Sequence, residues 1–486
     1  MQAWGGLFQA ACYLVVFAVC VVIFAKTSSR SVRQTILLFA SMALYLTWTP
    51  WFAAVLATSI LVNFLLGKWL RRDPHALPLM TGIVFNLALL SCFKYLPEFA
   101  DRVHALQGFA RIALPLGISF WTFQALSYLF DLYRQEELDP SLVEFALYMA
   151  FFPVTISGPV CRLPDMLPQF RSGEKTPWSD IAPGLRRIAI GIFMMQLAKL
   201  LGQGILAGDG INRGFDRLTQ WSGPDVWCLV FGYGLQLFFD FAGYSHIAIG
   251  AAKMLGITVP ENFARPFHST SASMFWTRWH MSLSFWIRDY VFLFLIVLRR
   301  EAIWRNFVFI LSMVLFGLWH RASLLFLLWG LYHGILLVTH RQIEALQRKY
   351  DWTPSPLVWN PLSWIATITA ISLAWVLFRA NSLAQARQMF SSVFSPEKYG
   401  FHFLSGSLYA LVLTLGLSYA AVSLVSEMIQ SYEDRGEAES RSQTFAWLAR
   451  SRWYWITPLY VLAIIFVLMV TLTQSDSAAQ FMYRGF

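Results

Sequence analysis

Charge is scarce in this sequence. Lys, Arg, Asp and Glu together make up 13% of the 486 residues, whereas soluble domains carry about 25%. Polar linkers are scarce as well, although a soluble chain of this length would divide into two or more domains. In their place, apolar runs of roughly 17 to 25 residues recur, the length that a helix needs to cross a lipid bilayer. The composition therefore predicts an integral, multi-pass membrane protein of the all-α class.

Several motifs that would define other enzyme classes are absent. The five cysteines form no C-x-x-C pair, no two of the nine histidines are four residues apart, and no H-E-x-x-H occurs. A disulfide framework and a metal centre are therefore not expected. The sequence also lacks a P-loop, G-x-S-x-G, G-x-G-x-x-G and the H-x-x-x-x-D pattern of many membrane-associated acyltransferases. No bound cofactor is predicted.

The positive charge does not indicate a nucleic-acid partner. The net charge is +10, but the basic residues cluster in short breaks between apolar runs, as at 68–72 and 341–349. Lys and Arg at such positions set the orientation of membrane helices. We therefore expect membrane lipid, and not nucleic acid, around this chain.

The apolar runs suggest one membrane domain, 1–486, with three parts. Residues 1–111 are predicted to form helical hairpins, 112–380 the functional core, and 381–486 the C-terminal helices. In the core, Pro, Gly and ionisable residues interrupt the apolar runs, which membranes tolerate only inside protein or beside a water-filled cavity. Broken or re-entrant helices around a cavity are therefore expected there. The plainest predicted spans lie near 6–25, 35–49, 51–67, 78–93, 361–378, 407–426 and 454–473, and a polar loop or surface helix is expected over 427–452.

The apolar segment 231–246 contains polar residues at helical spacing. Tyr233, Gln236, Asp240 and Tyr244 are spaced so that they share one face of a helix. A lone carboxylate in a membrane helix is costly and points to function by default. The competing interpretation is a packing network in which Arg or Tyr of another helix holds Asp240, and residue chemistry alone leans toward it.

The segment 274–290 is dense in Trp, Arg and His. Its polar side chains could line an entrance to the cavity. Chemistry alone slightly favours another interpretation, an amphipathic helix at the membrane surface whose arginines reach lipid phosphates. The polar residues in question are Arg278, His280, Ser284, Arg288 and Asp289.

His320 ends a long apolar stretch and follows Trp319. Poor solvation disfavours the imidazolium ion, so the neutral, proton-accepting form that a general base needs is expected. His333 lies 13 residues further on, and a continuous helix could not direct both rings to one site. His333 is therefore interpreted as structural. Residue chemistry thus leads to a polar cavity with a neutral histidine, which suits an enzyme or a proton-coupled transporter.

Three of these segments resemble the membrane-bound O-acyltransferase family, most closely the bacterial branch with alginate O-acetyltransferases and teichoic acid D-alanyltransferases. They contain Asp-Phe-Ala-Gly-Tyr-Ser at 240–245, Arg-Trp-His-Met-Ser-Leu-Ser at 278–284 and Gly-Leu-Trp-His at 317–320. His246 and Arg321 depart from the family pattern. Further matching stretches follow the family's order at 115–128, 151–160, 260–266, 328–334 and 374–380.

The resemblance implies a ring of tilted, broken helices around a funnel or tunnel. It places His320 as the essential base and His280 as the second histidine. Gln236, Asp240, Tyr244, Arg278, Ser284 and Trp319 are expected along the tunnel. The implied enzyme is an O-acyltransferase of a bacterial inner membrane that moves an acyl group, most simply acetyl from acetyl-CoA or another acyl thioester.

The implied acceptor is a hydroxyl of an exported polysaccharide such as alginate or cellulose, and a periplasmic esterase-like acetyltransferase of the SGNH type is the implied partner. Three alternatives stay open at this point. They are D-alanyl or other acyl transfer to teichoic acid or lipid, a proton-coupled transporter, and a catalytically silent scaffold.

Overall fold

The computed structural model describes residues 2–47, 50–100, 113–205 and 208–434. Within these ranges the chain is helical, and the β-type pairing is limited to an isolated bridge between Phe263 and Trp279. Eight helices of the described residues are long and apolar enough to cross a membrane. The predicted class, an all-α multi-pass membrane protein, is confirmed.

The chain divides into two compact units that alternate along the sequence. Unit 1 comprises Met1–Gly191, Tyr244–Ala264 and Trp276–Ser312, and unit 2 comprises Ile192–Gly243, Arg265–Phe275 and Met313–Phe486. Three long helices contribute residues to both units. They are α9 (Ile181–Gln203), α11 (Gly223–Met254) and α15 (Ala302–His320).

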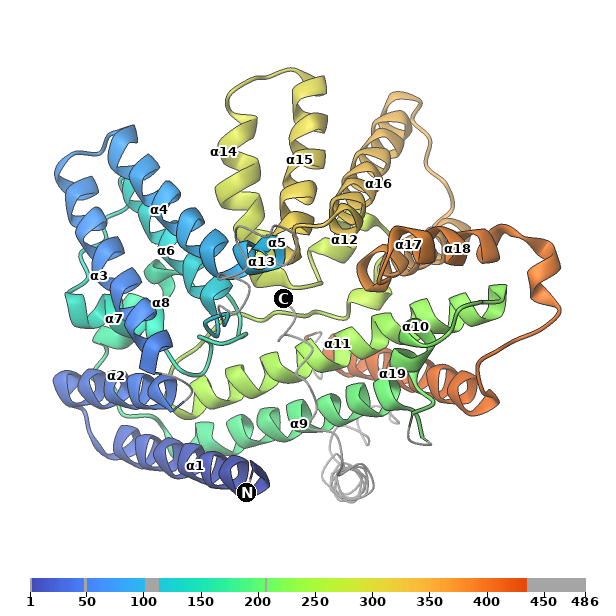
Figure 1. The fold of residues 1–486 in the computed structure, drawn as a ribbon. Helices are drawn as coiled ribbons and strands as arrows, with labels where there is room; N and C mark the ends of the chain where they lie inside the picture. The colour runs from blue at the N-terminus through green and yellow to red at the C-terminus, as the bar shows by residue number, and fades with distance from the viewer. Residues whose placement is uncertain (1, 48–49, 101–112, 206–207, 435–486) are drawn as a thin grey trace. The chain divides into compact units, whose positions relative to one another are not determined.

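Unit 1 begins with the predicted hairpins, and each of the first four predicted spans is a helix. Helices α3, α4 and α6 pack against one another (Figure 1). Gly67 of α3 permits the close approach, because a Cβ at this position would lie 2.2 Å from the hydroxyl oxygen of Tyr128 on α6. The helices are α1 (Gln2–Lys26), α2 (Arg30–Leu46), α3 (Pro50–Arg72), α4 (Ala76–Lys94), α5 (Leu96–Ala100), α6 (Ile118–Tyr133), α7 (Leu142–Ala150) and α8 (Leu163–Arg171).

The predicted spans near 361–378 and 407–426 are helices of unit 2, and the span near 454–473 lies outside the described residues. The polar segment expected from 427 begins inside α19, which continues to Asp434. The helices of this unit are α10 (Ile211–Asp216), α16 (Leu324–Lys349), α17 (Pro356–Arg379), α18 (Leu383–Phe394) and α19 (Gly406–Asp434). Shorter helices between α11 and α15 are α12 (Ala272–Trp276), α13 (Met281–Trp286) and α14 (Leu293–Ile296).

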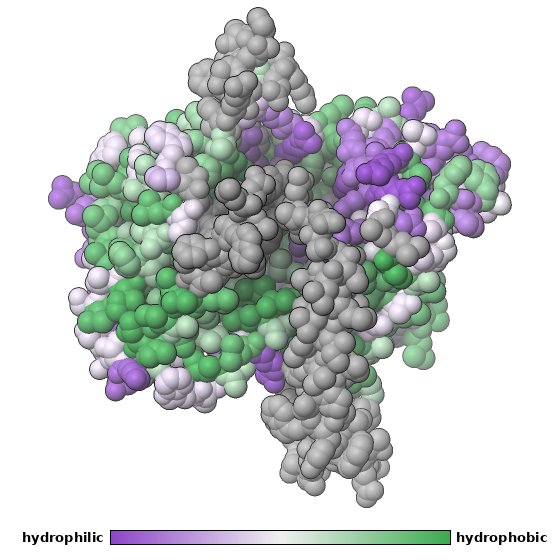
Figure 2. Space-filling view, turned by 60° about the horizontal axis from the view of Figure 1, so that its bottom comes forward, coloured by the Kyte–Doolittle hydropathy of each residue, from purple (hydrophilic) through white to green (hydrophobic). Residues whose placement is uncertain are grey.

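Large apolar side chains cover much of the surface. Figure 2 shows broad hydrophobic patches on the face that it presents. Leu357 at the start of α17 is 88% exposed, and Phe39 in the middle of α2 is 74% exposed. Soluble monomers rarely expose contiguous apolar patches of this kind. These surfaces suit contact with lipid acyl chains, as expected for a multi-pass membrane protein.

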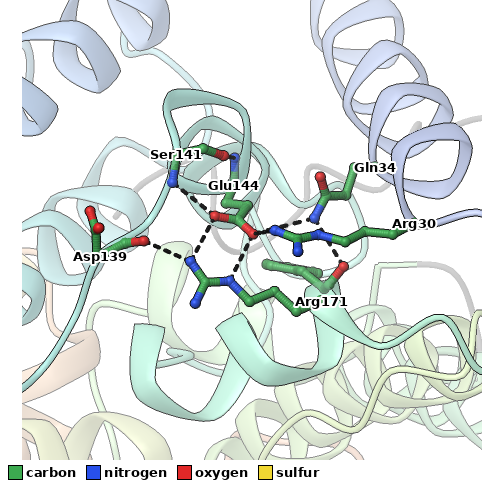
Figure 3. A network of polar contacts seen from close by, with 7 residues as sticks. Arg30, Gln34, Asp139, Ser141, Glu144 and Arg171 are labelled. Atoms are coloured by element: carbon green, nitrogen blue, oxygen red, sulfur yellow. Dashed lines mark hydrogen bonds and ion pairs between the residues drawn. The ribbon is translucent and has the colours of Figure 1, made fainter.

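A buried carboxylate ties α2, α7 and α8 together in unit 1 (Figure 3). The Glu144 side chain is 1% exposed, and it accepts hydrogen bonds from Arg30 and Arg171. It also forms a capping box with Ser141 at the start of α7. Burial opposes ionisation of Glu144, but the hydrogen bonds from Arg171 and Ser141 outweigh it and lower its pKa to about 2. Glu144 is therefore ionised at neutral pH and holds both arginines.

Replacing Glu144 with alanine is expected to lower the free energy of unfolding by about 2–3 kcal/mol, because two arginines and a helix cap lose their partner. The measurement is thermal or chemical unfolding of the purified protein in detergent. Asp139→Asn is the matched control, because the Asp139 side chain is 80% exposed in its pair with Arg71 and such pairs contribute about 0–1 kcal/mol. Equal losses in the two variants would contradict the role given to Glu144.

Candidate active site

The residues predicted for the site fall into both units. Tyr244, Arg278, His280 and Ser284 belong to unit 1, and Gln236, Asp240, Trp319 and His320 belong to unit 2.

His320 is the last residue of α15 and is 7% exposed. Trp319 and Phe316 of the same helix contact its ring, with centroid distances of 4.6 and 5.1 Å. Phe378 of α17 lies 5.1 Å away and Phe326 of α16 lies 5.9 Å away. This aromatic enclosure shields the imidazole from bulk water. The position suits a general base in a water-poor site.

The helical structure is interrupted directly after His320. Helix α15 ends there and α16 begins at Leu324, with Ser323 accepting a hydrogen bond from the Phe326 backbone as its N-cap. The assumption of one continuous helix from His320 to His333 was therefore wrong. The two helices pack closely at Gly317, where a Cβ would lie 2.2 Å from the Phe326 carbonyl oxygen.

This break brings His333 into the same aromatic cluster. The Trp329 ring lies 5.7 Å from His320 and 4.7 Å from His333. His333 is 1% exposed on α16. Two buried imidazoles thus contact one indole, an arrangement that sequence spacing on a single helix did not predict.

The polar residues predicted to share one helical face lie on the continuous helix α11. Within unit 2, Tyr233 contacts Phe378, the ring that also contacts His320, at 6.4 Å. Gln236 is buried and donates to Asn212 at 3.3 Å. Asp240 is half-buried, and in the described part of the chain it makes no hydrogen bond or ion pair. The packing network in which Arg or Tyr holds Asp240 is therefore not found among these residues.

His280 occupies an unusual backbone position. It follows the turn after α12 and precedes α13, with φ 44° and ψ 52° in the left-handed region. Non-glycine residues rarely adopt this conformation, and Asn, Asp and His do so more readily than others. The prediction of one amphipathic helix over 274–290 was wrong, because the chain turns at His280 and becomes π-helical over Ile287–Phe292. Such π-helical stretches are frequent at functional sites.

A polar network fixes the His280 ring in unit 1. Its Nδ1 lies 3.0 Å from the side-chain oxygen of Asn262, and that oxygen also accepts from the Ser282 hydroxyl at 2.9 Å. The Asn262 amide donates to Ser245 at 3.1 Å. Since the Asn262 oxygen only accepts, Nδ1 must donate, and the lone pair resides on Nε2. Burial lowers the pKa of His280 to about 3, so the ring is neutral at physiological pH and Nε2 can accept a hydrogen bond.

The remaining predicted residues of this segment have local roles. The Arg278 carbonyl accepts from the Ala264 backbone at 3.0 Å, and the Ser284 hydroxyl donates to the Trp279 carbonyl at 3.0 Å. Both contacts stabilise the turn that carries His280. Sequence spacing predicted neither contact, because the turn itself was not predicted.

Asp289 is paired on two sides. Arg162 donates to it at 2.7 Å and Arg288 at 2.6 Å. The neighbouring Tyr290 donates to Asp131 at 2.8 Å, and burial raises the pKa of Asp131 to about 6. An entrance lined by Arg288 and Asp289 was one of two interpretations of this segment, and in the structure they belong to this ion-pair cluster of unit 1.

Tyr244 lines a mostly apolar cavity of about 680 Å³ in unit 1. Tyr45, Thr155 and Ser41 also line it. Among the residues that the structure describes, no group of three or more His, Cys, Asp or Glu side chains is placed to hold a metal ion.

Comparisons with known proteins agree on one family. Residues 130–379 match the membrane-bound O-acyltransferase family. The chain is 34% identical over 385 residues to a probable alginate O-acetylase of Pseudomonas aeruginosa, covering 76% of this chain and 71% of that protein. It is 31% identical over 388 residues to a peptidoglycan O-acetyltransferase of Helicobacter pylori, covering 72% and 71%. It is 31% identical over 325 residues to a teichoic acid D-alanyltransferase of Bacillus subtilis, covering 61% and 78%.

Proposed function

The chain belongs to the membrane-bound O-acyltransferase family, and from this premise we propose that it acetylates a hydroxyl of an exported polysaccharide. It is an O-acyltransferase and a multi-pass membrane protein. The alginate and peptidoglycan relatives support a polysaccharide acceptor and an acetyl group. The buried, aromatic-enclosed His320 is the single structural observation that most supports acyl transfer at this chain.

In the proposed reaction, His320 removes the proton of the acceptor hydroxyl as its oxygen attacks the acyl carbonyl carbon. A tetrahedral intermediate forms and collapses, the carbon–sulfur bond of the thioester breaks, and the sulfur takes the proton from His320 and leaves as the thiol. General-base assistance of this kind contributes about 10²- to 10⁴-fold. Exclusion of water by the aromatic rings limits hydrolysis of the donor.

His280 is proposed to position the acceptor. With the proton on Nδ1, Nε2 is a hydrogen-bond acceptor, which suits a sugar hydroxyl better than an acyl carbonyl. The polar side chains Gln236, Asp240 and Tyr244 of α11 are proposed to line the route of the substrates, together with Arg278, Ser284 and Trp319.

The proposed donor is acetyl-CoA or another acyl thioester that arrives from the cytoplasm. The proposed location is the bacterial inner membrane, which the membrane-spanning helices and the bacterial origin of the relatives support. A periplasmic esterase-like acetyltransferase is the proposed partner. D-alanyl transfer to teichoic acid is the second candidate, and the similarity to a teichoic acid D-alanyltransferase favours it.

Deletion of the gene, followed by complementation, tests the acceptor directly. Mass spectrometry and NMR of the surface polymers should show loss of O-acetyl groups from a polysaccharide and their return on complementation. Loss of D-alanyl esters instead would support the second candidate. Unchanged acylation of all surface polymers would contradict the proposal.

A further inference from the structure

A long apolar groove lies within unit 2, apart from the aromatic cluster at His320. It encloses about 1000 Å³, the upper end of the range of about 300–1,000 Å³ typical of small-molecule sites. Helices α11, α17 and α19 form its walls, and the turn Pro266–His268 contributes Phe267 and His268. The Trp364 indole of α17 donates to the Phe267 carbonyl at 2.8 Å and fixes this turn against the groove.

One face of α19 defines the length of the groove. Its lining residues Tyr409, Leu413, Gly416, Ala420 and Leu424 recur at intervals of three or four residues, the spacing of a single helical face. Fifteen residues separate the first from the last, so the groove follows about 22 Å of helix. This is an elongated apolar slot in a helix that is long and apolar enough to span a membrane.

The same helical face continues into a charged end. Glu427 follows Leu424 by three residues, and its carboxylate lies 3.5 Å from the Arg265 guanidinium and 3.8 Å from Nδ1 of His268. His268 also lines the groove. Cationic and anionic side chains thus stand together where the apolar slot ends, and the Glu427 side chain is 57% exposed.

We propose that this groove binds one phospholipid with a zwitterionic, amine-bearing headgroup. The acyl chains occupy the apolar slot along α19. The phosphate pairs with Arg265, assisted by His268, and the ammonium group pairs with Glu427. A membrane supplies such lipids continuously, and a purely anionic headgroup would place its charge beside the Glu427 carboxylate, which costs free energy.

Lipid retention by the purified full-length protein tests whether the acyl chains of a phospholipid occupy the apolar groove. The protein is reconstituted with equal amounts of phosphatidylethanolamine and phosphatidylglycerol, extracted in mild detergent and analysed by native mass spectrometry. The wild type should retain one phosphatidylethanolamine. Ala420→Phe fills the slot and should lower retention by at least about tenfold. Val422→Phe is the matched control, because Val422 is 66% exposed and does not line the groove, and it should bind as the wild type does.

Two further variants test the proposed contacts with the headgroup. Glu427→Gln removes the partner of the ammonium group and should shift the preference toward phosphatidylglycerol, whereas Arg265→Gln should weaken retention of both lipids. Unchanged retention in Ala420→Phe would overturn the proposal, as would a wild type that retains no lipid because another protein segment fills the groove. A wild-type preference for phosphatidylglycerol would overturn the zwitterionic headgroup.

Discussion

A His320→Gln variant is expected to lose acyl transfer by about 10²- to 10⁴-fold in kcat, because glutamine cannot take the proton of the acceptor hydroxyl. Glutamine preserves most of the volume inside the aromatic rings, so the protein should still insert and unfold at nearly the wild-type temperature. The measurement is transfer of a labelled acetyl group by the purified, reconstituted protein, at saturating donor and acceptor.

His333→Gln is the matched control for this experiment. His333 is also buried and contacts the same Trp329 ring, so the two variants disturb the aromatic cluster to a similar degree. Because His333 has no assigned proton transfer, its variant should retain most of the activity. Comparable losses in both variants would mean that packing of the cluster, and not proton transfer by His320, carries the effect.

A His280→Asn variant is expected to lower kcat/KM by about 10²-fold, the cost of misplacing a reacting group by about an ångström. Asparagine is chosen because it tolerates the left-handed backbone at this position, whereas alanine would add strain to the loss of the ring. If His280 positions the acceptor, KM for the acceptor should rise and KM for the donor should not. Wild-type kinetics in the asparagine variant would exclude His280 from the reaction.

The pH dependence of stability gives His280 a second readout. Its imidazole has a pKa of about 3 in the folded protein against 6.5 without burial, so below pH 6.5 the unfolded chain binds a proton that the folded one does not. The contribution of His280 to the free energy of unfolding is complete above pH 6.5 and decreases as the pH drops toward 3. At pH 5 the loss amounts to about 2 kcal/mol. His280→Asn should remove this part of the pH dependence, as measured by unfolding at pH 7.5 and 5.

Hydrophobic runs identified the long helices because each span has to satisfy its own backbone hydrogen bonds in lipid. Helices α2, α3, α4, α17 and α19 therefore lie where the apolar runs predicted them. The face of α11 that carries Gln236 and Asp240 could also be predicted, since helical periodicity alone determines it.

The broken segments could not be predicted in the same way, because their turns depend on long-range contacts. The left-handed His280 is held by Asn262, and nothing in the sequence near 280 indicates that partner. The start of α16 did carry a signal, because Ser323 stands before an apolar run as an N-cap does. That signal would have predicted the break after His320, and with it the approach of His333. The Glu144 network was missed as well, since Arg30 and Arg171 are distant from it in sequence.

The most direct test of the account is acyl transfer across a reconstituted membrane. Purified protein is placed in vesicles with labelled acetyl thioester on one side and an unmodified acceptor polysaccharide on the other, and ester formation on the sugar is followed by mass spectrometry. Acetyl esters should form on the polysaccharide, and their formation should depend on the imidazole of His320. Movement of solute or protons without ester formation, or equal ester formation by His320→Gln, would contradict it.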